Sequence, residues 1–106
     1  MAEYILSILR AQSIVVFSWG LHNPIELPDN KGLAFLVNGY KHQGWVFVKY
    51  NDGADLFDID LRKTDMELVK IIHDVYFDQL VDVIDCAVEK TADYDERVKK
   101  QYNIQK

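Results

Sequence analysis

Acidic side chains are concentrated late in the chain, in a stretch that contains no Lys or Arg. This segment, "DVYFDQLVDVIDCAVE" over residues 74–89, contains Asp74, Asp78, Asp82, Asp85 and Glu89. Like charges three or four residues apart on a helix destabilise it by about 0.2–0.5 kcal/mol per pair. Such a row is either an ordinary solvated face or a docking surface for a basic protein partner. A third interpretation is that the chain's own bases neutralise it, with Arg62, Lys63 and Lys70 as candidates.

Two aromatic residues form a second candidate surface. Trp45 and Phe47 occupy alternate positions of a predicted strand, and Asp58 and Asp60 occupy alternate positions of the next one. Large aromatic side chains that cluster on a solvent-facing surface are typical of protein interfaces. If the N-terminal helix covers this face of the sheet, both residues belong to the core instead. The sequence leaves these two alternatives open.

The three histidines form no recognisable catalytic or metal-binding pattern. His22 lies in a predicted loop, His42 in a hairpin connection and His73 at the end of a strand. No pair of them has the His-x-x-x-His spacing of a metal site on a helix. The loop over residues 19–32 begins with "WGLHNP", which is ordinary turn chemistry but is also typical of ligand-binding loops. A small-ligand or catalytic domain that uses this loop and the histidines is therefore one hypothesis.

Other residues that could do chemistry also lack the necessary spacing. The acid-rich segment "NDGADLFDID", residues 51–60, offers oxygen ligands but does not match a calcium-binding loop. Cys86 falls at the margin of a predicted helix's apolar side, where a small, poorly reactive thiol is expected. The chain has no Gly-x-Ser-x-Gly elbow and no Gly-rich phosphate loop. We expect no metal and no cofactor, and we do not expect an enzyme.

Composition predicts one small globular domain over residues 1–106. Apolar residues make up 49% of the chain and charged residues 27%, which is typical of a folded domain. The net charge of −5 is uneven, because residues 1–53 contain four acids and four bases while residues 54–106 contain thirteen acids and eight bases. Direct nucleic-acid binding needs a basic stripe, so we expect neither nucleic acid nor an anionic membrane as a partner.

The chain shows no sign of secretion or membrane insertion. Its one cysteine cannot form an intrachain disulfide. The N-terminus has Glu3 where a signal peptide has positive charge, and Arg10 interrupts the apolar run. No stretch approaches the roughly 20 apolar residues that span a bilayer. We therefore expect a cytoplasmic protein.

Hydrophobic periodicity predicts an α+β fold. A short helix over residues 2–11 is followed by a strand over 13–20, "SIVVFSWG", and by a loop over 21–32 that holds both prolines and suits an edge connection. From Leu33 the apolar period becomes two. This pattern predicts four consecutive strands, "LAFLVNG", "GWVFVKYN", "ADLFDIDLR" and "MELVKII". The expected sheet is an antiparallel meander of four to five strands.

Turn chemistry sets the expected strand register. Asp52-Gly53 is typical of a two-residue hairpin turn and pairs Val48 with Phe57. A second turn at residues 63–65 then pairs Phe57 with Ile71. The side of the sheet that faces the core is expected to consist of Val46, Val48, Phe57, Ile59, Val69 and Ile71.

From about Tyr76 the apolar period returns to 3.6 residues, which predicts a helix to about residue 90 that packs on one face of the sheet. Asp74 and Asp78 fall near its start, where carboxylates suit the helix dipole. The acids face away from its apolar side, which consists of Phe77, Leu80, Val81, Ile84, Ala87 and Val88. Residues 92–106 are either a short helix or a frayed tail.

Most of residues 17–90 resemble a small family of uncharacterised proteins from Bacteroides-type bacteria and their mobile elements. The likeness rests on the segments "FSWGLHNP", "LAFLVNGYKHQGWVFVKYNDGADLFDIDL" and "VKIIHDVYFDQLVDVID". It contains no catalytic signature, so it assigns no functional residue. It implies an α+β domain of bacterial cytosolic origin and suggests an accessory role in a mobile element.

The sequence favours a small non-enzymatic domain that binds another protein through its acidic helix or its aromatic sheet face. The partner is an unidentified protein, basic if the acidic helix is used, and a second copy of the chain is one candidate. The main alternative is a DNA-mimicking or accessory inhibitor of a mobile element. That function would need acids spread over more surface than one helix offers.

Overall fold

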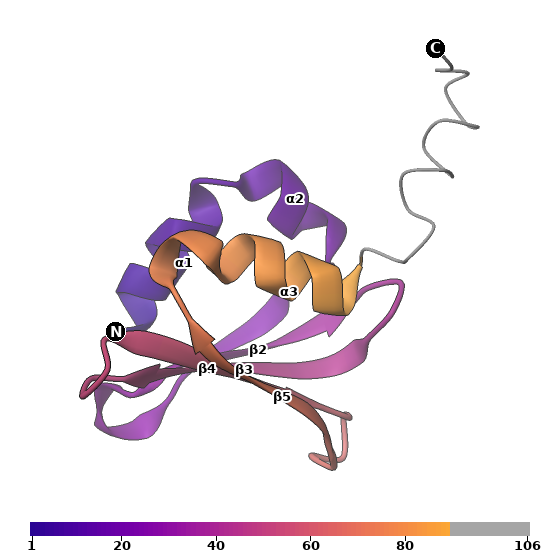
Figure 1. Cartoon of the computed structure of the whole chain (residues 1–106). Helices are drawn as coiled ribbons and strands as arrows, with labels where there is room; N and C mark the ends of the chain where they lie inside the picture. Colours follow the sequence, from indigo (N-terminus) through magenta and orange to yellow (C-terminus); the bar gives the residue numbers. More distant parts are fainter. Residues whose placement is uncertain (90–106) are drawn as a thin grey trace.

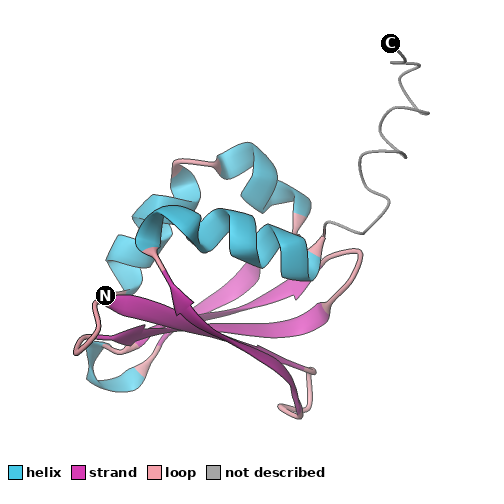
Figure 2. Ribbon diagram, viewed as in Figure 1, coloured by secondary structure: helices cyan, strands magenta, loops and turns pink. Residues whose placement is uncertain are grey.

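The computed structural model describes residues 1–89 as two layers, an antiparallel sheet and three helices on one side of it (Figure 1, Figure 2). The five strands pair in the order β1-β2-β3-β4-β5, so each lies beside its neighbour in the sequence. They are β1 His22–Glu26, β2 Gly32–Asn38, β3 Gln43–Asn51, β4 Leu56–Arg62 and β5 Leu68–Val75. The helices are α1 Ala2–Arg10, α2 Ser13–Ser18 and α3 Leu80–Val88, with 3₁₀ turns η1 Pro28–Asn30 and η2 Phe77–Gln79. The predicted α+β meander is confirmed.

The helix or tail expected over residues 92–106 lies outside the described residues. Within residues 1–89, no helix combines the length and the apolar character that a membrane crossing requires.

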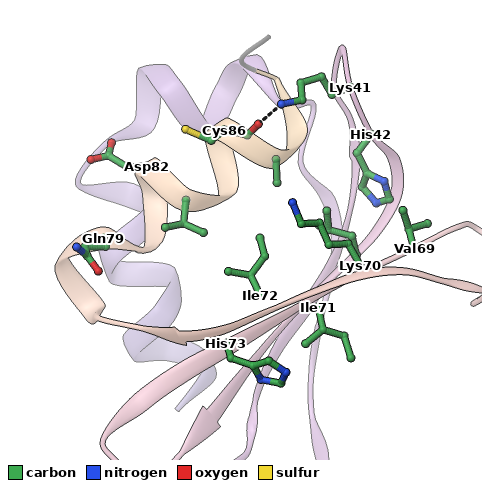
Figure 3. A pocket seen from close by; sticks show the side chains of 13 residues that line it. Lys41, His42, Val69, Lys70, Ile71, Ile72, His73, Gln79, Asp82 and Cys86 are labelled. Atoms are coloured by element: carbon green, nitrogen blue, oxygen red, sulfur yellow. Dashed lines mark hydrogen bonds between the residues drawn. The ribbon is translucent and has the colours of Figure 1, made fainter. Parts of the chain in front are cut away.

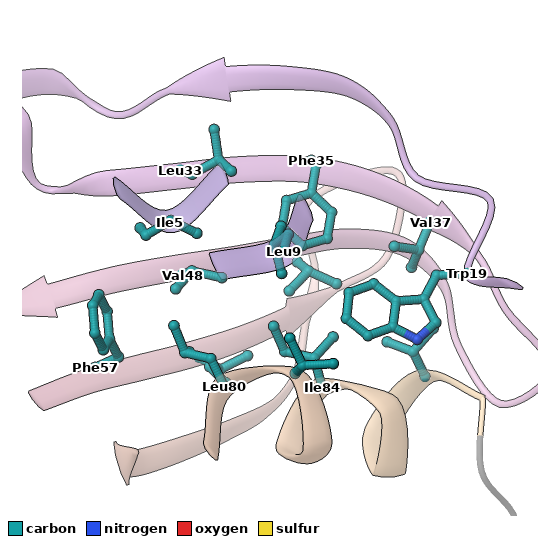
Figure 4. Packing of buried hydrophobic residues seen from close by; sticks show 14 of the residues in the cluster. Ile5, Leu9, Trp19, Leu33, Phe35, Val37, Val48, Phe57, Leu80 and Ile84 are labelled. Carbon is teal, nitrogen blue, oxygen red and sulfur yellow. The ribbon is translucent and has the colours of Figure 1, made fainter. Parts of the chain in front are cut away.

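The hydrophobic core lies between the helices and one face of the sheet, which we call the covered face (Figure 4). Ile5 and Leu9 of α1 and Leu80 and Ile84 of α3 reach it from the helical layer. The strands contribute alternate residues, Leu33, Phe35, Val37, Val46, Val48, Phe57, Ile59 and Leu61, all of them buried. The predicted core positions Val46, Val48, Phe57 and Ile59 are therefore correct.

Residues 13–18 form the helix α2, so the strand predicted for this segment is wrong. Val15 and Val16 turn toward the core, while Ile14 and Phe17 are 87% and 85% exposed. The segment leads into Trp19, whose side chain is fully buried. β-branched residues favour strands in isolation, but packing of the neighbouring side chains overrides that preference.

The proline-containing segment includes an edge strand, where the sequence suggested a loop or an edge connection. β1 pairs with β2 through Ile25 opposite Ala34, and its register is irregular between His22 and Ile25. Asn23 has a positive φ of 54° within this irregularity. Pro24 lacks an N–H donor, and an edge strand with a bulge tolerates that loss.

The β3–β4 hairpin differs from the expected register by two residues. Val48 lies opposite Ile59 where Phe57 was expected, because a four-residue turn replaces the two-residue one. Asp55 adopts a positive φ of 57° in this turn and accepts a 2.6 Å hydrogen bond from the Tyr50 hydroxyl. That hydrogen bond raises the pKa of Tyr50. Side chains alternate with a period of two, so a shift of two residues leaves every side chain on its predicted face.

The core residues predicted on β5 are wrong because the strand pairs with β4 in a different register. Val69 and Ile71 were expected to face the core but are 52% and 40% exposed. Two irregularities in the β4–β5 pairing bring Ile72 opposite Ile59 and Val75 opposite Phe57 instead. One of them lies at Asp74, which has a positive φ of 61° and donates its N–H to Asp58 Oδ1 at 3.1 Å. The other lies between Leu68 and Lys70, and because a bulge adds one residue to a strand, it turns Ile71 away from the core and Ile72 toward it.

The last helix starts later than predicted. The turn η2 occupies Phe77–Gln79, α3 starts at Leu80, and Phe77 is exposed and not part of the core. The end of α3 packs on the β2–β3 connection, where the Lys41 N–H donates to Val88 O at 2.7 Å. A Cβ at Gly39 would lie 2.3 Å from Val88 Cγ1, so only glycine fits this close approach.

Candidate functional site

The five acids of residues 74–89 are distributed over three consecutive elements and the residue that follows them. Asp74 lies on β5 and Asp78 in η2, while Asp82 and Asp85 belong to α3 and Glu89 follows its last turn. The placement of Asp74 near the start of a helix is therefore wrong, because the bulge extends β5 to Val75.

Two of these acids have hydrogen-bond partners within the molecule. Asp85 Oδ1 accepts a 2.9 Å hydrogen bond from Trp19 Nε1, which joins α3 to the end of α2. Glu89 Oε2 accepts one of 2.8 Å from the backbone N–H of Tyr40. A buried indole N–H without a partner costs about 1–3 kcal/mol, so the first bond has a clear structural role. Asp78 and Asp82 are exposed.

The second face of the sheet, which we call the open face, lies opposite the helical layer (Figure 1). The N-terminal helix packs on the covered face, so it does not cover Trp45 and Phe47. Residues directly opposite each other in antiparallel strands share a face. The pairing therefore assigns two rows to the open face: Ile25, Ala34, Phe47, Asp60 and Ile71 in one, and Leu36, Trp45, Arg62 and Leu68 in the other.

The aromatic pair on the open face is held together by side-chain contacts. The ring centroids of Trp45 and Phe47 are 6.0 Å apart with an interplanar angle of 50°. The Arg62 guanidinium lies 5.5 Å from the Phe47 centroid, within the range of a cation–π interaction. The same guanidinium donates to Met66 O at 3.1 Å, which fixes its position. Both aromatic side chains are half-buried by these neighbours.

Asp60 lies at the centre of the open face with a side chain only 2% exposed. Its Oδ2 is 2.8 Å from Lys49 Nζ and 3.2 Å from Arg62 Nη2. Its Oδ1 is buried and has no hydrogen-bond partner among the residues that the structure describes. A buried carboxylate is tolerated when cations pair with it, so the Lys49–Asp60–Arg62 group is a fixed polar centre within an apolar surface.

A groove of about 950 Å³ separates β5 from α3 (Figure 3). Its lining includes the apolar residues Leu61, Ile72, Val83 and Ala87. The side chains of Ile72 and Lys70 point from β5 into the groove, while Ile71 and His73 point to the other side of the strand (Figure 3). At the far end, Lys41 Nζ donates to the carbonyl of Cys86. This groove has an apolar lining and carries two ammonium groups.

The three histidines occupy separate environments. His22 is on the edge strand β1, with Nδ1 2.7 Å from Gly20 O. His42 is buried, with Nε2 3.1 Å from Trp45 O. His73 on the opposite edge strand has Nδ1 3.3 Å from Asp58 Oδ1. His42 and His73 both border the groove, but His22 and the rest of the 19–32 loop do not. The three histidines and this loop therefore do not form one site.

Within residues 1–89, no three His, Cys, Asp or Glu side chains come together as a metal site. Cys86 is exposed on α3, where the sequence predicted a position at the margin of its apolar side.

Sequence reasoning missed the groove and the role of Lys70. The segment "LVKII" has a single Lys among apolar residues, and this was the available signal. The expected register placed Lys70 beside Asp58 on the outer face. The structure pairs it with Leu61 on the helix side, because a bulge shifts β5.

Comparison with protein-family models finds no matching family, and comparisons with curated proteins and with solved structures find no match. The resemblance to a family of mobile-element proteins stays a prediction. Function is therefore inferred from the geometry of the described residues.

Proposed function

We propose that the protein is a non-enzymatic interaction domain that binds another protein through the open face of its sheet. The observation that carries this proposal is that the central residues of β2 and β3 are apolar on the open face as well as on the covered face, although helices cover only the covered face. Ala34, Leu36, Trp45 and Phe47 face away from the helices. An antiparallel sheet with one solvated face normally alternates apolar and polar residues, and strands that are apolar throughout are typical of sheets covered on both sides.

The arrangement of the open face also suits recognition. Interfaces are enriched in Trp, Phe and Arg near their centre, and all three occur here in mutual contact. The bonds of Asp60 to Lys49 and Arg62 hold these side chains in place before a partner arrives. Preorganised side chains lose less conformational entropy on binding.

The acidic helix is the weaker of the two candidate surfaces. Asp85 and Glu89 already accept hydrogen bonds within the molecule, and Asp74 is on a strand. Asp74, Asp78 and Asp82 are exposed, but of these three only Asp82 belongs to α3. A DNA-mimicking inhibitor would need a wider array of free carboxylates, so the geometry favours the open face.

Paired variants test the proposal. Trp45→Lys places a charge on the open face, and Ile14→Lys places the same charge on α2, where the native side chain is already 87% exposed. Both proteins should fold, as checked by circular dichroism and thermal unfolding. In affinity capture from a cell extract, partners retained by the wild type and by Ile14→Lys should be lost from Trp45→Lys.

Identical capture profiles for the two variants would reject the open face as the binding surface. Sedimentation of the purified chain distinguishes one special case. If the wild type is a dimer and Trp45→Lys a monomer, the partner on the open face is a second copy.

A further inference from the structure

The strand β5 forms one edge of the sheet and is unusually apolar for that position. Among residues 1–89, no strand pairs with its outer side. Leu68, Val69 and Ile71 are exposed along it. Edge strands present unpaired N–H and C=O groups, and proteins normally protect such edges with charges, prolines or covering elements. The exposed apolar side chains of β5 are typical of an edge that another strand covers.

The groove lies directly beside this edge and gives an added strand a place to lie. α3 forms one wall and β5 the other (Figure 3). A strand that pairs with β5 would direct alternate side chains toward the groove, where Leu61, Ile72 and Val83 form an apolar lining. Strand addition of this kind combines main-chain hydrogen bonds for affinity with pockets for alternate side chains for specificity.

Charge in the groove indicates the chemistry of the occupant. Lys70 extends into it, and its ammonium has no hydrogen bond or ion pair within residues 1–89 (Figure 3). The Lys41 ammonium lies at the same groove and bonds only a carbonyl, that of Cys86, within the described residues. The lining also includes one carboxylate, that of Asp82. The two ammonium groups outnumber it, and an excess of positive charge beside an apolar lining complements a carboxylate flanked by apolar side chains.

From this geometry we infer that the groove binds an extended segment of another protein, which adds to the edge of β5. The segment carries apolar side chains at alternate positions and an acidic side chain that meets Lys70 and Lys41. This surface consists of the groove and the outer edge of β5, and β4 lies between β5 and β3, which carries Trp45 and Phe47. Either proposal can therefore fail without the other. The binding requires no contribution from Trp45 or Phe47.

Selection from a library of random linear dodecapeptides on the immobilised full-length chain tests the inference. Selected peptides should share alternating apolar residues and at least one Asp or Glu. Their binding, measured by fluorescence anisotropy, should weaken about tenfold in Lys70→Glu, the effect of losing a charge-assisted hydrogen bond. Lys70 is exposed and has no partner within residues 1–89, so this variant should fold as the wild type does. Ile14→Lys, remote from the groove, should bind the peptides unchanged.

Two measurements on a selected peptide locate it and establish how it binds. Titration of the ¹⁵N-labelled protein should shift the amide resonances of 68–75 and 80–88 most. Amide exchange of the outward-facing N–H groups of β5 should slow. A peptide with N-methylated backbone amides should not bind, because it cannot pair with the edge.

The inference is overturned if the library yields no peptide, or if selected peptides bind Lys70→Glu as well as the wild type. Shifts confined to α2 or to the open face would also overturn it. The inference also fails if the wild type sediments as a dimer and Lys70→Glu as a monomer. In that case a second copy of this chain, and not a segment of another protein, pairs with the edge of β5.

Discussion

The two faces of the sheet are built from similar residues but have different surroundings. On the covered face, Phe35, Val48 and Ile59 are fully buried under the helices. On the open face, Phe47 is half-buried by its neighbours alone and packs against Arg62. Apolar character in a strand therefore does not show which face the helices cover. It shows only that both faces are suited to being covered.

The two faces should also contribute differently to the stability of the fold and to partner binding. Side chains on the covered face contact both layers, so their removal leaves a cavity. Side chains on the open face contact the sheet on one side and solvent on the other, so their removal exposes little that was buried. We therefore expect substitutions on the two faces to separate folding from binding.

The largest difference is expected between matched phenylalanines on adjacent strands. Phe35→Ala should lower the free energy of unfolding by about 3–5 kcal/mol because it leaves a cavity in a fully buried site. Phe47→Ala should lower it by about 1 kcal/mol, the loss of a partly exposed ring and its cation–π contact. Urea denaturation followed by tryptophan fluorescence measures both.

If Phe35→Ala does not fold, Phe35→Leu serves in its place with a loss of about 1–2 kcal/mol, since it removes much less volume from the core. Equal losses for Phe35→Ala and Phe47→Ala would show that the open face is part of the core.

A smaller effect is expected at the polar centre of the open face. Asp60→Asn leaves Lys49 and Arg62 without their common carboxylate. It should lower the free energy of unfolding by about 1–3 kcal/mol. This loss is smaller than that for a fully buried ion pair because both cations are partly exposed to solvent. Asp58→Asn is the matched control on the same strand. It keeps an oxygen to accept the Asp74 N–H, so its loss should stay below about 0.5 kcal/mol.

Equal midpoints for Asp60→Asn and the wild type in urea would show that the three-residue group does not stabilise the fold. The same variant should weaken partner binding if Lys49 and Arg62 are held for recognition, and this can be read from the capture experiment.

The smallest of these effects is expected on the helical layer. Asp85→Ala removes the acceptor of the buried Trp19 N–H and should lower the free energy of unfolding by about 1–2 kcal/mol. Asp82→Ala, one turn away and exposed, should change it by less than about 0.5 kcal/mol. Thermal unfolding of both variants measures this difference. Equal melting temperatures would show that the Asp85 carboxylate does not stabilise the fold.

Several parts of the fold follow from the sequence because they depend on local periodicity. The alternation in residues 33–62 identifies Val46, Val48, Phe57 and Ile59 as core positions, and even a two-residue register error leaves them on that face. The 3.6-residue period similarly identifies Leu80 and Ile84 as the buried side of α3. The candidate residues Trp45 and Phe47 were recognised by the same alternation.

Other features depended on contacts between residues distant in the sequence. The segment 13–18 is a helix because Trp19 is buried and donates to Asp85, 66 residues away. The irregularity between Leu68 and Lys70 turns Ile71 outward and Ile72 into the groove. The bulge at Asp74, whose N–H donates to Asp58 on the adjacent strand, brings Val75 opposite Phe57. The periodicity of a strand is local and can be read from its residues. Bulges, the side on which helices pack and the free edge of β5 are decided by tertiary contacts, because each depends on groups that meet only in the folded chain.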